Sequence, residues 1–143
     1  MPTPTKNDEP TTVAFVCVQN AGRSQMAYAF AEREKRERGR DDLEFVTGGT
    51  RPADHVHPGV VEAMQAAGID ISARVPREVS FAEIQDADVV ITMGCSAEDV
   101  CPANWSGENR DWNLDDPDGK SPEEVARIRD DIEARVQELF EEF

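Results

Sequence analysis

The sequence predicts a single α/β domain in which helices cover both faces of a parallel sheet. Two short apolar runs, residues 12–18 and 87–93, are rich in β-branched side chains, which is typical of buried strands. Segments with helical spacing lie between and after such runs, and strands that alternate with helices form parallel sheets. The length of 143 residues fits one domain, which we expect to span residues 12–143.

Residues 1–47 are predicted to form a tail, two strands and one helix. Residues 1–11 are polar and proline-rich, which indicates a flexible N-terminal tail. The strand at 12–18 is followed by a helix over 23–38, and Gly39 is a natural helix end. A second strand is expected at 43–47.

The middle of the chain is predicted to be mainly helical. Apolar residues recur at helical spacing over 58–67, and Gly68 ends that helix. A short extended segment is expected at 69–71. Ser80 and Glu83 have the spacing of a capping box, which marks the start of a short helix.

The last third predicts two strands and a long helix. The strand at 87–93 is followed by a final strand at 110–113. Ser121 and Pro122 then begin an amphipathic helix, whose apolar residues recur every three or four positions up to Phe143.

Net charge restricts the partners of the protein. The 30 acidic and 15 basic residues give a charge of −15, so nucleic acid and anionic membranes are repelled. No apolar run approaches the ~20 residues of a membrane span and no signal peptide is evident, so a cytoplasmic protein is expected. Only three basic residues are lysine, and this acid-rich, lysine-poor composition favours a halophile over an ordinary acidic bacterial protein.

The strongest candidate site is the loop between the first strand and the first helix. Cys17 ends the strand, and Arg23 and Ser24 stand where the helix begins. A tight loop at a helix N-terminus turns backbone N–H groups toward an anion, and Ala21 and Gly22 are small enough for close approach. A guanidinium suits phosphate-like oxygens, and the same field favours a nucleophilic thiolate. The alternative is a structural cysteine beside a surface arginine.

A pair of cysteines follows the second buried strand. Cys95 and Cys101 are expected at the same sheet edge as Cys17, which favours a thiol–disulfide relay. Residues six apart on a helix are ~9 Å apart along its axis, beyond the ~7 Å limit for a disulfide, so a Cys95–Cys101 bond requires this segment to leave helical form. The alternatives are two buried thiols, or a zinc site completed by His55 and His57.

A third candidate is the turn at residues 115–117, Asp-Asp-Pro. A carboxylate held over an anion site can donate a proton to a leaving oxygen, and Asp116 would do so if the turn lies over the Cys17 loop. On its own the motif indicates only a turn. His55 and His57 are otherwise interpreted as loop residues before the helix at 58–67.

The loop around Cys17 resembles the phosphate-binding loop of the low-molecular-weight protein tyrosine phosphatase superfamily. Within that superfamily, it is most similar to the thiol-dependent arsenate reductases. The resemblance covers nearly all of residues 12–143 and is carried by these segments: 17–27, 68–72, 93–95, 101–102, 111–117 and 128–132. It implies a four-stranded parallel sheet flanked by helices and a single catalytic domain.

The resemblance also implies residue roles. Cys17 matches the nucleophile, Asp116 the general acid and Arg23 the oxyanion-binding arginine. Ser24 matches a hydroxyl that stabilises the thiolate, and Asn20 matches a residue that shapes the loop. The oxyanion would be held by Val18, Gln19, Asn20, Ala21, Gly22, Arg23 and Ser24.

The implied reaction is arsenate reduction through a disulfide cascade. Cys17 attacks arsenate while Asp116 protonates the departing oxygen. Cys95 then attacks Cys17 and releases arsenite, and Cys101 attacks Cys95. A thioredoxin-like protein or a low-molecular-weight thiol would reduce the final disulfide.

Further implications concern partners and ions. We expect a monomer with no cofactor, although some relatives bind potassium, for which Asn20, Thr47 and Asp70 would be candidate ligands. Gly22 departs from the family pattern, because a second cysteine is common at that position.

Two other functions remain open. One is a phosphatase of the same superfamily, but that branch typically has aromatic residues after its Asp-Pro, whereas Asp118 and Gly119 follow here and Tyr28 is the only tyrosine. The other is a metal- or redox-sensing module that uses the cysteines with His55 and His57.

Overall fold

The structure, a computed structural model, describes residues 10–94 and 107–143 and contains a four-stranded sheet in which all strands are parallel. The spatial order is β2-β1-β3-β4, so β1 lies inside the sheet between β2 and β3. The expected α/β class and the parallel sheet are confirmed. The strands are β1 (Thr11–Cys17), β2 (Leu43–Gly49), β3 (Val89–Met93) and β4 (Glu108–Asp111).

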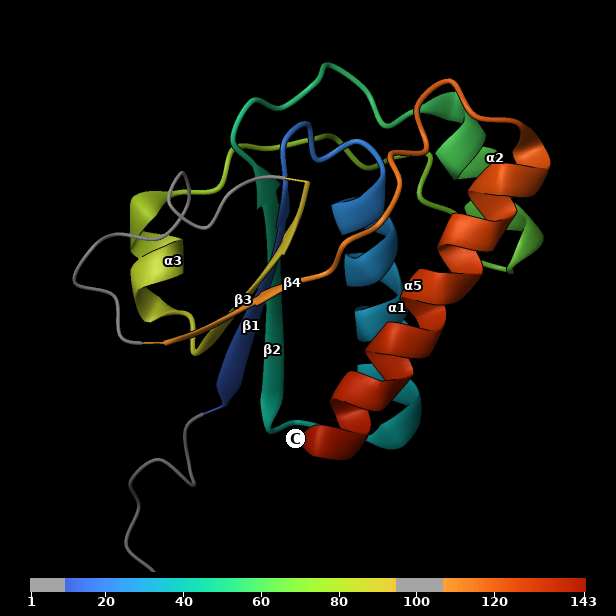
Figure 1. Cartoon of the computed structure of the whole chain (residues 1–143). Coiled ribbons are helices and arrows are strands. Elements are labelled where there is room, and N and C mark those ends of the chain that lie inside the picture. The colour runs from blue at the N-terminus through green and yellow to red at the C-terminus, as the bar shows by residue number, and fades with distance from the viewer. Residues whose placement is uncertain (1–9, 95–106) are drawn as a thin grey trace, which may run out of the picture.

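Helices cover both faces of the sheet (Figure 1). One face carries α1, α2 and α5, and the other carries α3. The predicted capping boxes at Ser80 and Ser121 are present, and Gly39 ends α1 in the left-handed conformation. No helix in the described ranges is long and apolar enough to cross a membrane. The helices are α1 (Arg23–Arg38), α2 (Pro58–Ala66), α3 (Phe81–Asp86) and α5 (Pro122–Glu142).

A hydrophobic core lies on each face of the sheet, and successive side chains of β1 point alternately into one or the other. Val13, Phe15 and Cys17 enter the larger core, which α1 and α5 cover, whereas Ala14 and Val16 enter the smaller core beneath α3. Cys17 is the last residue of this strand, so it lies at the carboxyl edge of the sheet and on the face where α1 begins.

The boundaries of β3 and β4 differ from the sequence prediction. β3 begins two residues later than expected, because Ala87 still belongs to the end of α3 and donates its N–H to Ile84 O. β4 ends at Asp111, two residues earlier than expected. Trp112 nevertheless donates its N–H to Thr92 O at 2.9 Å, so the polypeptide still follows β3 past the end of β4.

Residues 69–71, expected to be a short extended segment, are neither helix nor strand. Ile69 instead donates its N–H to Met64 O and so completes the end of α2. β2 is longer than predicted and continues through Gly48 and Gly49. A Cβ on Gly49 would lie 2.5 Å from Val18 O, so this glycine is what permits β2 to end directly beneath the Cys17 loop.

Candidate active site

The loop between β1 and α1 is held from outside by the segment that follows β2. The carbonyl groups of Cys17, Val18, Gln19 and Ala21 accept hydrogen bonds of 2.8 to 3.2 Å from backbone N–H groups within residues 50–57. In a planar trans peptide the N–H points away from the carbonyl that precedes it. The N–H group after each of these carbonyls therefore points into the loop, which forms a concave surface suited to an anion.

The Cys17 sulfur lies inside this concave surface. Cys17 is 3% exposed, and its Sγ accepts a hydrogen bond of 3.1 Å from the N–H of Asn20. The Ser24 hydroxyl lies 2.7 Å from the same sulfur. The Asn20 N–H and the Ser24 hydroxyl hydrogen can therefore both be directed at this buried sulfur.

Asn20 connects this sulfur to the surrounding structure. Its backbone has a φ of 51°, a left-handed conformation that asparagine tolerates better than most residues. Its Oδ1 accepts from Arg77 N at 3.0 Å and from Gln25 Nε2 at 2.9 Å, whereas its Nδ2 donates to Ser24 Oγ at 2.7 Å and to Thr47 Oγ1 at 3.0 Å. A backbone N–H can only donate, so the Asn20 amide has one orientation, which leaves the Ser24 proton free to point at the sulfur.

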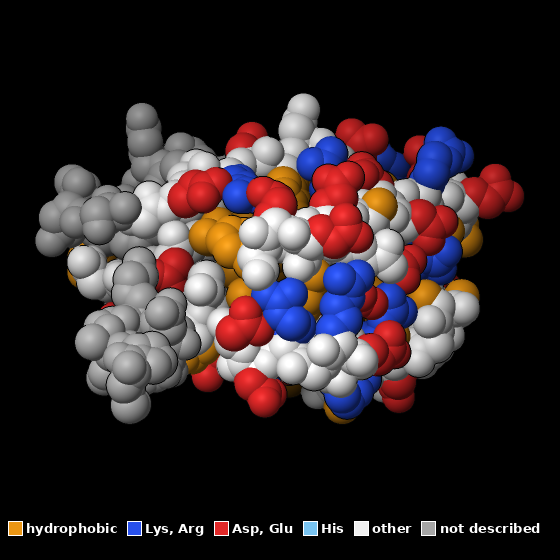
Figure 2. Space-filling model, turned by 90° about the horizontal axis from the view of Figure 1, so that it is seen from below, with side chains coloured by type: hydrophobic (Ala, Val, Ile, Leu, Met, Phe, Trp, Pro, Cys, Tyr) orange, Lys and Arg blue, Asp and Glu red, His pale blue; other side chains and the backbone are white. Residues whose placement is uncertain are grey.

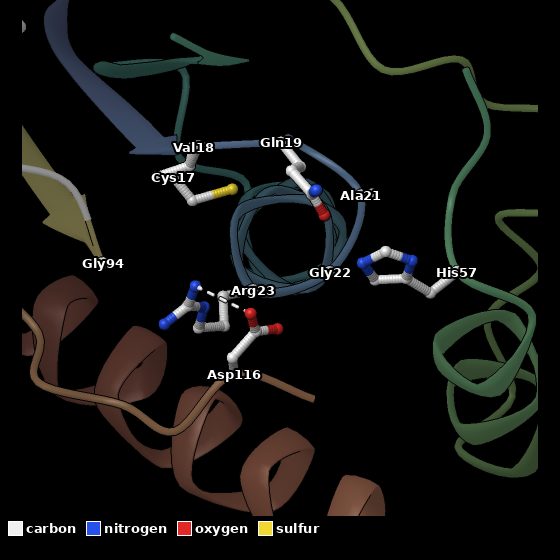
Figure 3. A pocket seen from close by; sticks show the side chains of 9 residues that line it. All are labelled: Cys17, Val18, Gln19, Ala21, Gly22, Arg23, His57, Gly94 and Asp116. Atoms are coloured by element: carbon white, nitrogen blue, oxygen red, sulfur yellow. Dashed lines mark ion pairs between the residues drawn. The ribbon is translucent and has the colours of Figure 1, made fainter. Parts of the chain in front are cut away.

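Arg23 and Asp116 lie together at the mouth of the loop (Figure 3). Arg23 donates to Leu114 O at 3.0 Å, and its guanidinium is 3.9 Å from the Asp116 carboxylate. The Arg23 side chain is 11% exposed, whereas that of Asp116 is 59% exposed. Gly94 lies against the guanidinium, where a Cβ would be 2.6 Å from an Arg23 nitrogen.

These residues surround a cavity of about 230 Å³. The predicted nucleophile, oxyanion-binding arginine and general acid share this space, although they come from segments far apart in the sequence. None of the described residues that line the cavity is Phe, Tyr or Trp. They are Cys17, Val18, Gln19, Ala21, Gly22, Arg23, His57, Gly94 and Asp116.

Two lining residues were not identified from the sequence. His57 was interpreted as a loop residue, but its ring faces the cavity and its N–H donates to Ala21 O at 2.9 Å. Gly94 follows β3 directly, and only its place at the end of a buried strand could have indicated a role. His55 is exposed and does not line the cavity.

Gly22 accommodates the turn that contains Asp116. A Cβ on Gly22 would lie 2.8 Å from Pro117 Cγ and 3.6 Å from the His57 ring. The absence of a side chain at this position therefore lets Pro117 pack directly on the loop. The family's second cysteine would not fit here without displacing the turn.

Other predicted site residues are placed differently or not described. Cys95 and Cys101 lie outside the described residues. The three candidate potassium ligands do not surround one site. Asn20 is hydrogen-bonded to Thr47, and its Oδ1 already accepts two other hydrogen bonds. Asp70 lies on the wall of a different cavity, where it accepts from Ser72 N at 2.9 Å. Hydrogen bonds from Ser72 hold the pKa of Asp70 below its usual value. Within residues 10–94 and 107–143, no cluster of three or more His, Cys, Asp or Glu could hold a metal ion.

Comparison with known proteins identifies the family. A putative arsenate reductase from Halobacterium salinarum is 56% identical over 137 residues, which are 95% of each chain. A solved arsenate reductase in the phosphate binding state is 32% identical with a TM-score of 0.77, and the match covers 92% of this chain and 98% of that one.

A second solved structure is a thioredoxin-dependent arsenate reductase from Corynebacterium glutamicum. It is 34% identical with a TM-score of 0.75, and the match covers 94% of this chain but 62% of that longer one. The family model for low molecular weight phosphotyrosine protein phosphatase matches residues 12–143. The resemblance deduced from the Cys17 loop is confirmed, and this chain belongs to the low-molecular-weight phosphotyrosine protein phosphatase family.

Proposed function

We propose that this protein reduces arsenate to arsenite. The observation that carries the proposal is a ring of inward N–H groups around a buried cysteine, with an arginine and a carboxylate at its mouth. The cavity suits a small oxyanion, and its described lining offers no aromatic wall for a phosphotyrosine ring. The arsenate reductase names of several relatives add support.

The first step is nucleophilic attack by Cys17. The thiolate, stabilised by Asn20 N–H and the Ser24 hydroxyl, attacks arsenic while the loop N–H groups and Arg23 hold the oxyanion. Asp116 supplies a proton to the departing oxygen, which leaves as water. Its carboxyl is exposed, so it can exchange protons with solvent between turnovers.

The second stage moves two electrons from thiols to arsenic. Cys95 attacks the Cys17 sulfur, and the electron pair of the S–As bond leaves with arsenic, which departs as arsenite. Cys101 then attacks Cys95, releases Cys17 as a thiolate and leaves a Cys95–Cys101 disulfide. A thioredoxin-like protein or a small thiol reduces that disulfide, and the name of the Corynebacterium relative favours thioredoxin.

The test is arsenate turnover by the full chain with thioredoxin, thioredoxin reductase and NADPH. Serine at Cys17, Cys95 or Cys101 should each abolish multiple turnover. A single-turnover assay separates Cys101→Ser from the other two variants. Cys101→Ser should still release arsenite once per chain, whereas Cys95→Ser should not, because no thiol attacks Cys17.

Hydrolysis of an aryl phosphate is the control reaction. The same loop can hold phosphate, so weak phosphatase activity that needs Cys17 but neither Cys95 nor Cys101 is expected. If the aryl phosphate is hydrolysed efficiently and no arsenite forms, the protein is a phosphatase and the reductase proposal is wrong.

A further inference from the structure

A relay of hydrogen bonds joins Arg74, which lies outside the Cys17 cavity, to the Cys17 sulfur. Arg74 Nε donates to Gln25 Oε1 at 2.8 Å, and Gln25 Nε2 donates to Asn20 Oδ1 at 2.9 Å. Asn20 Nδ2 donates to Ser24 Oγ at 2.7 Å, and Ser24 Oγ is 2.7 Å from Cys17 Sγ. We call this sequence of contacts the Arg74 relay.

The N–H donors of the Arg74 relay all point toward the sulfur, and the relay ends at the Ser24–Cys17 contact, in which either atom can donate. A guanidinium has no acceptor, so the Gln25 oxygen must face Arg74 and its NH₂ group must face Asn20. The N–H of Arg77 imposes the matching orientation on Asn20. Arg74 therefore sets the orientation of Gln25 and the Arg77 N–H sets that of Asn20, and the aligned hydrogen bonds polarise one another.

The middle of the relay is buried and its outer end is anchored. Gln25 is 1% exposed, and Asn20 and Ser24 are fully buried, so water does not screen these contacts. Arg74 stacks over the Tyr28 ring with its guanidinium carbon 4.4 Å from the ring centre. It also borders a second cavity of about 440 Å³, distinct from the one that contains Cys17.

We propose that Arg74 is a positioning residue for Cys17: its guanidinium fixes the Gln25 amide, which together with the Arg77 N–H holds the Asn20 amide that directs the Ser24 hydroxyl hydrogen toward the sulfur. This inference rests on the proposed role of Cys17 as the nucleophile. Without Arg74, the Gln25 amide can rotate and withdraw its donor from Asn20 Oδ1. Asn20 is then held by the Arg77 N–H alone, and the Ser24 hydroxyl is held less firmly toward the sulfur.

The test is the rate at which iodoacetamide alkylates Cys17, followed across pH by mass spectrometry of the Cys17 peptide. Arg74→Met should slow alkylation about five- to tenfold, because the Ser24 donor to the sulfur is no longer firmly held. Arg74→Lys should restore part of the rate, because an ammonium also only donates. The charged and titratable side chains that line the sulfur's cavity, Arg23, His57 and Asp116, stay in every variant.

Arg110→Met is the matched control. Arg110 also lies against an aromatic ring, that of Phe143, and pairs with Glu108 and Glu142, but it has no contact with the Cys17 loop. Its alkylation profile should equal that of the wild type. An unchanged profile in an Arg74→Met protein with a native circular dichroism spectrum would overturn the proposal.

A double-mutant cycle tests the path through Gln25. Gln25→Met should slow alkylation as Arg74→Met does, and the double variant should be no slower than the slower single variant. Additive effects would show that Arg74 acts by another route. Alkylation needs no arsenate, so this experiment tests the role of Arg74 even if the protein does not reduce arsenate. If the reductase proposal also holds, kcat for arsenate should fall in parallel and KM should stay unchanged.

Discussion

Asn20 is the residue on which the largest number of site contacts converge. Its N–H donates to the Cys17 sulfur, and its side-chain NH₂ donates to Ser24 and Thr47. Its side-chain oxygen accepts hydrogen bonds from Gln25 and Arg77. Its left-handed backbone lets the loop reverse direction within a few residues. A residue that satisfies both the backbone and the side-chain requirement must be short and must carry a donor and an acceptor, which leaves asparagine.

Gly94→Ala should displace the Arg23 guanidinium and so weaken oxyanion binding in the proposed active site. A Cβ would lie 2.6 and 2.8 Å from the two terminal Arg23 nitrogens, so the guanidinium must move away from its place beside Leu114 O. We expect kcat/KM for arsenate to fall about tenfold, as when one oxyanion donor is displaced. The backbone φ of +87° should add a loss of about 1 to 2 kcal/mol in the free energy of unfolding, measured with urea.

Gly59→Ala is the matched control for that variant. A Cβ on Gly59, in α2, meets no atom within 4 Å, so kcat/KM should stay at the wild-type value and stability should rise slightly. Wild-type kcat/KM in Gly94→Ala would show that Arg23 does not need its present position.

Sequence reasoning identified the candidate site residues of the loop itself, but not the Arg77 and Gln25 groups that orient Asn20. Cys17 and Arg23 have a fixed spacing between a strand and a helix, which a single sequence can reveal. The Arg77 backbone N–H and the buried Gln25 amide belong to no local pattern, because their importance comes from contacts over 57 and 5 positions that only the folded chain brings together. Their roles therefore depend on tertiary structure.

At the scale of elements, α3 and the segment before it support the site through Arg77. Besides its N–H bond to Asn20, Arg77 donates to Thr47 O at 2.6 Å and to both carboxylate oxygens of Glu83 at 2.8 and 2.9 Å. Ser80 and Glu83 form the capping box of α3. The helix thereby fixes an arginine whose backbone orients the loop.

Glu83→Gln should show how much the negative charge of Glu83 contributes to stability through its ion pair with Arg77. Glutamine keeps the capping box, so the change removes mainly the ion pair, and we expect a loss of about 0.5 to 1 kcal/mol at neutral pH. Partial burial alone would raise the pKa of Glu83, but hydrogen bonds from Arg77 and Ser80 outweigh it and lower the pKa. The stabilisation is therefore present above the ordinary glutamate pKa and is lost as pH falls through the lowered value.

Urea unfolding across pH checks this expectation. The stability difference between wild type and Glu83→Gln should close as pH falls through the lowered pKa of Glu83, where the wild-type carboxyl becomes protonated. Asp86→Asn, at the other end of α3, is the control. A Glu83→Gln difference that is constant across pH would mean that the charge contributes nothing.

Element prediction was successful where the local signal was strong. Capping boxes at Ser80 and Ser121 located two helix starts correctly, because their spacing is a direct consequence of helix geometry. The end of β4 was predicted too late, because buried Trp112 looks like a strand residue although it follows the strand. The pairing of β4 with β3 sets that boundary, and pairing is not visible in one sequence.

For the whole molecule, charge opposes the proposed substrate. Residues 108–143 contain 13 acidic and five basic residues, and the turn with Asp116 lies within them. Seen from the end where the strands begin, basic and acidic side chains are interspersed (Figure 2). Arg40 and Arg110 pair with carboxylates. Arg23 and the loop N–H groups are thus a small positive site in a negative field.

We therefore predict that kcat/KM for arsenate rises with ionic strength, because salt screens the repulsion between the surface and the anion. Steady-state kinetics over a range of potassium chloride concentrations would measure this. Alkylation of Cys17 by neutral iodoacetamide is the control and should respond less. A flat or falling arsenate profile with the fold intact contradicts the prediction.

Some hydrogen bonds to Asn20 join residues that are far apart in the sequence, and this affects Cys17 in the unfolded chain. The contacts of Asn20 with Thr47 and Arg77 span 27 and 57 residues, so they form only when β2 and the segment before α3 have docked. We therefore expect Cys17 to react more slowly with electrophiles in a nascent or partly unfolded chain than in the folded protein. The alkylation rate of Cys17 would then report on whether the tertiary structure is complete.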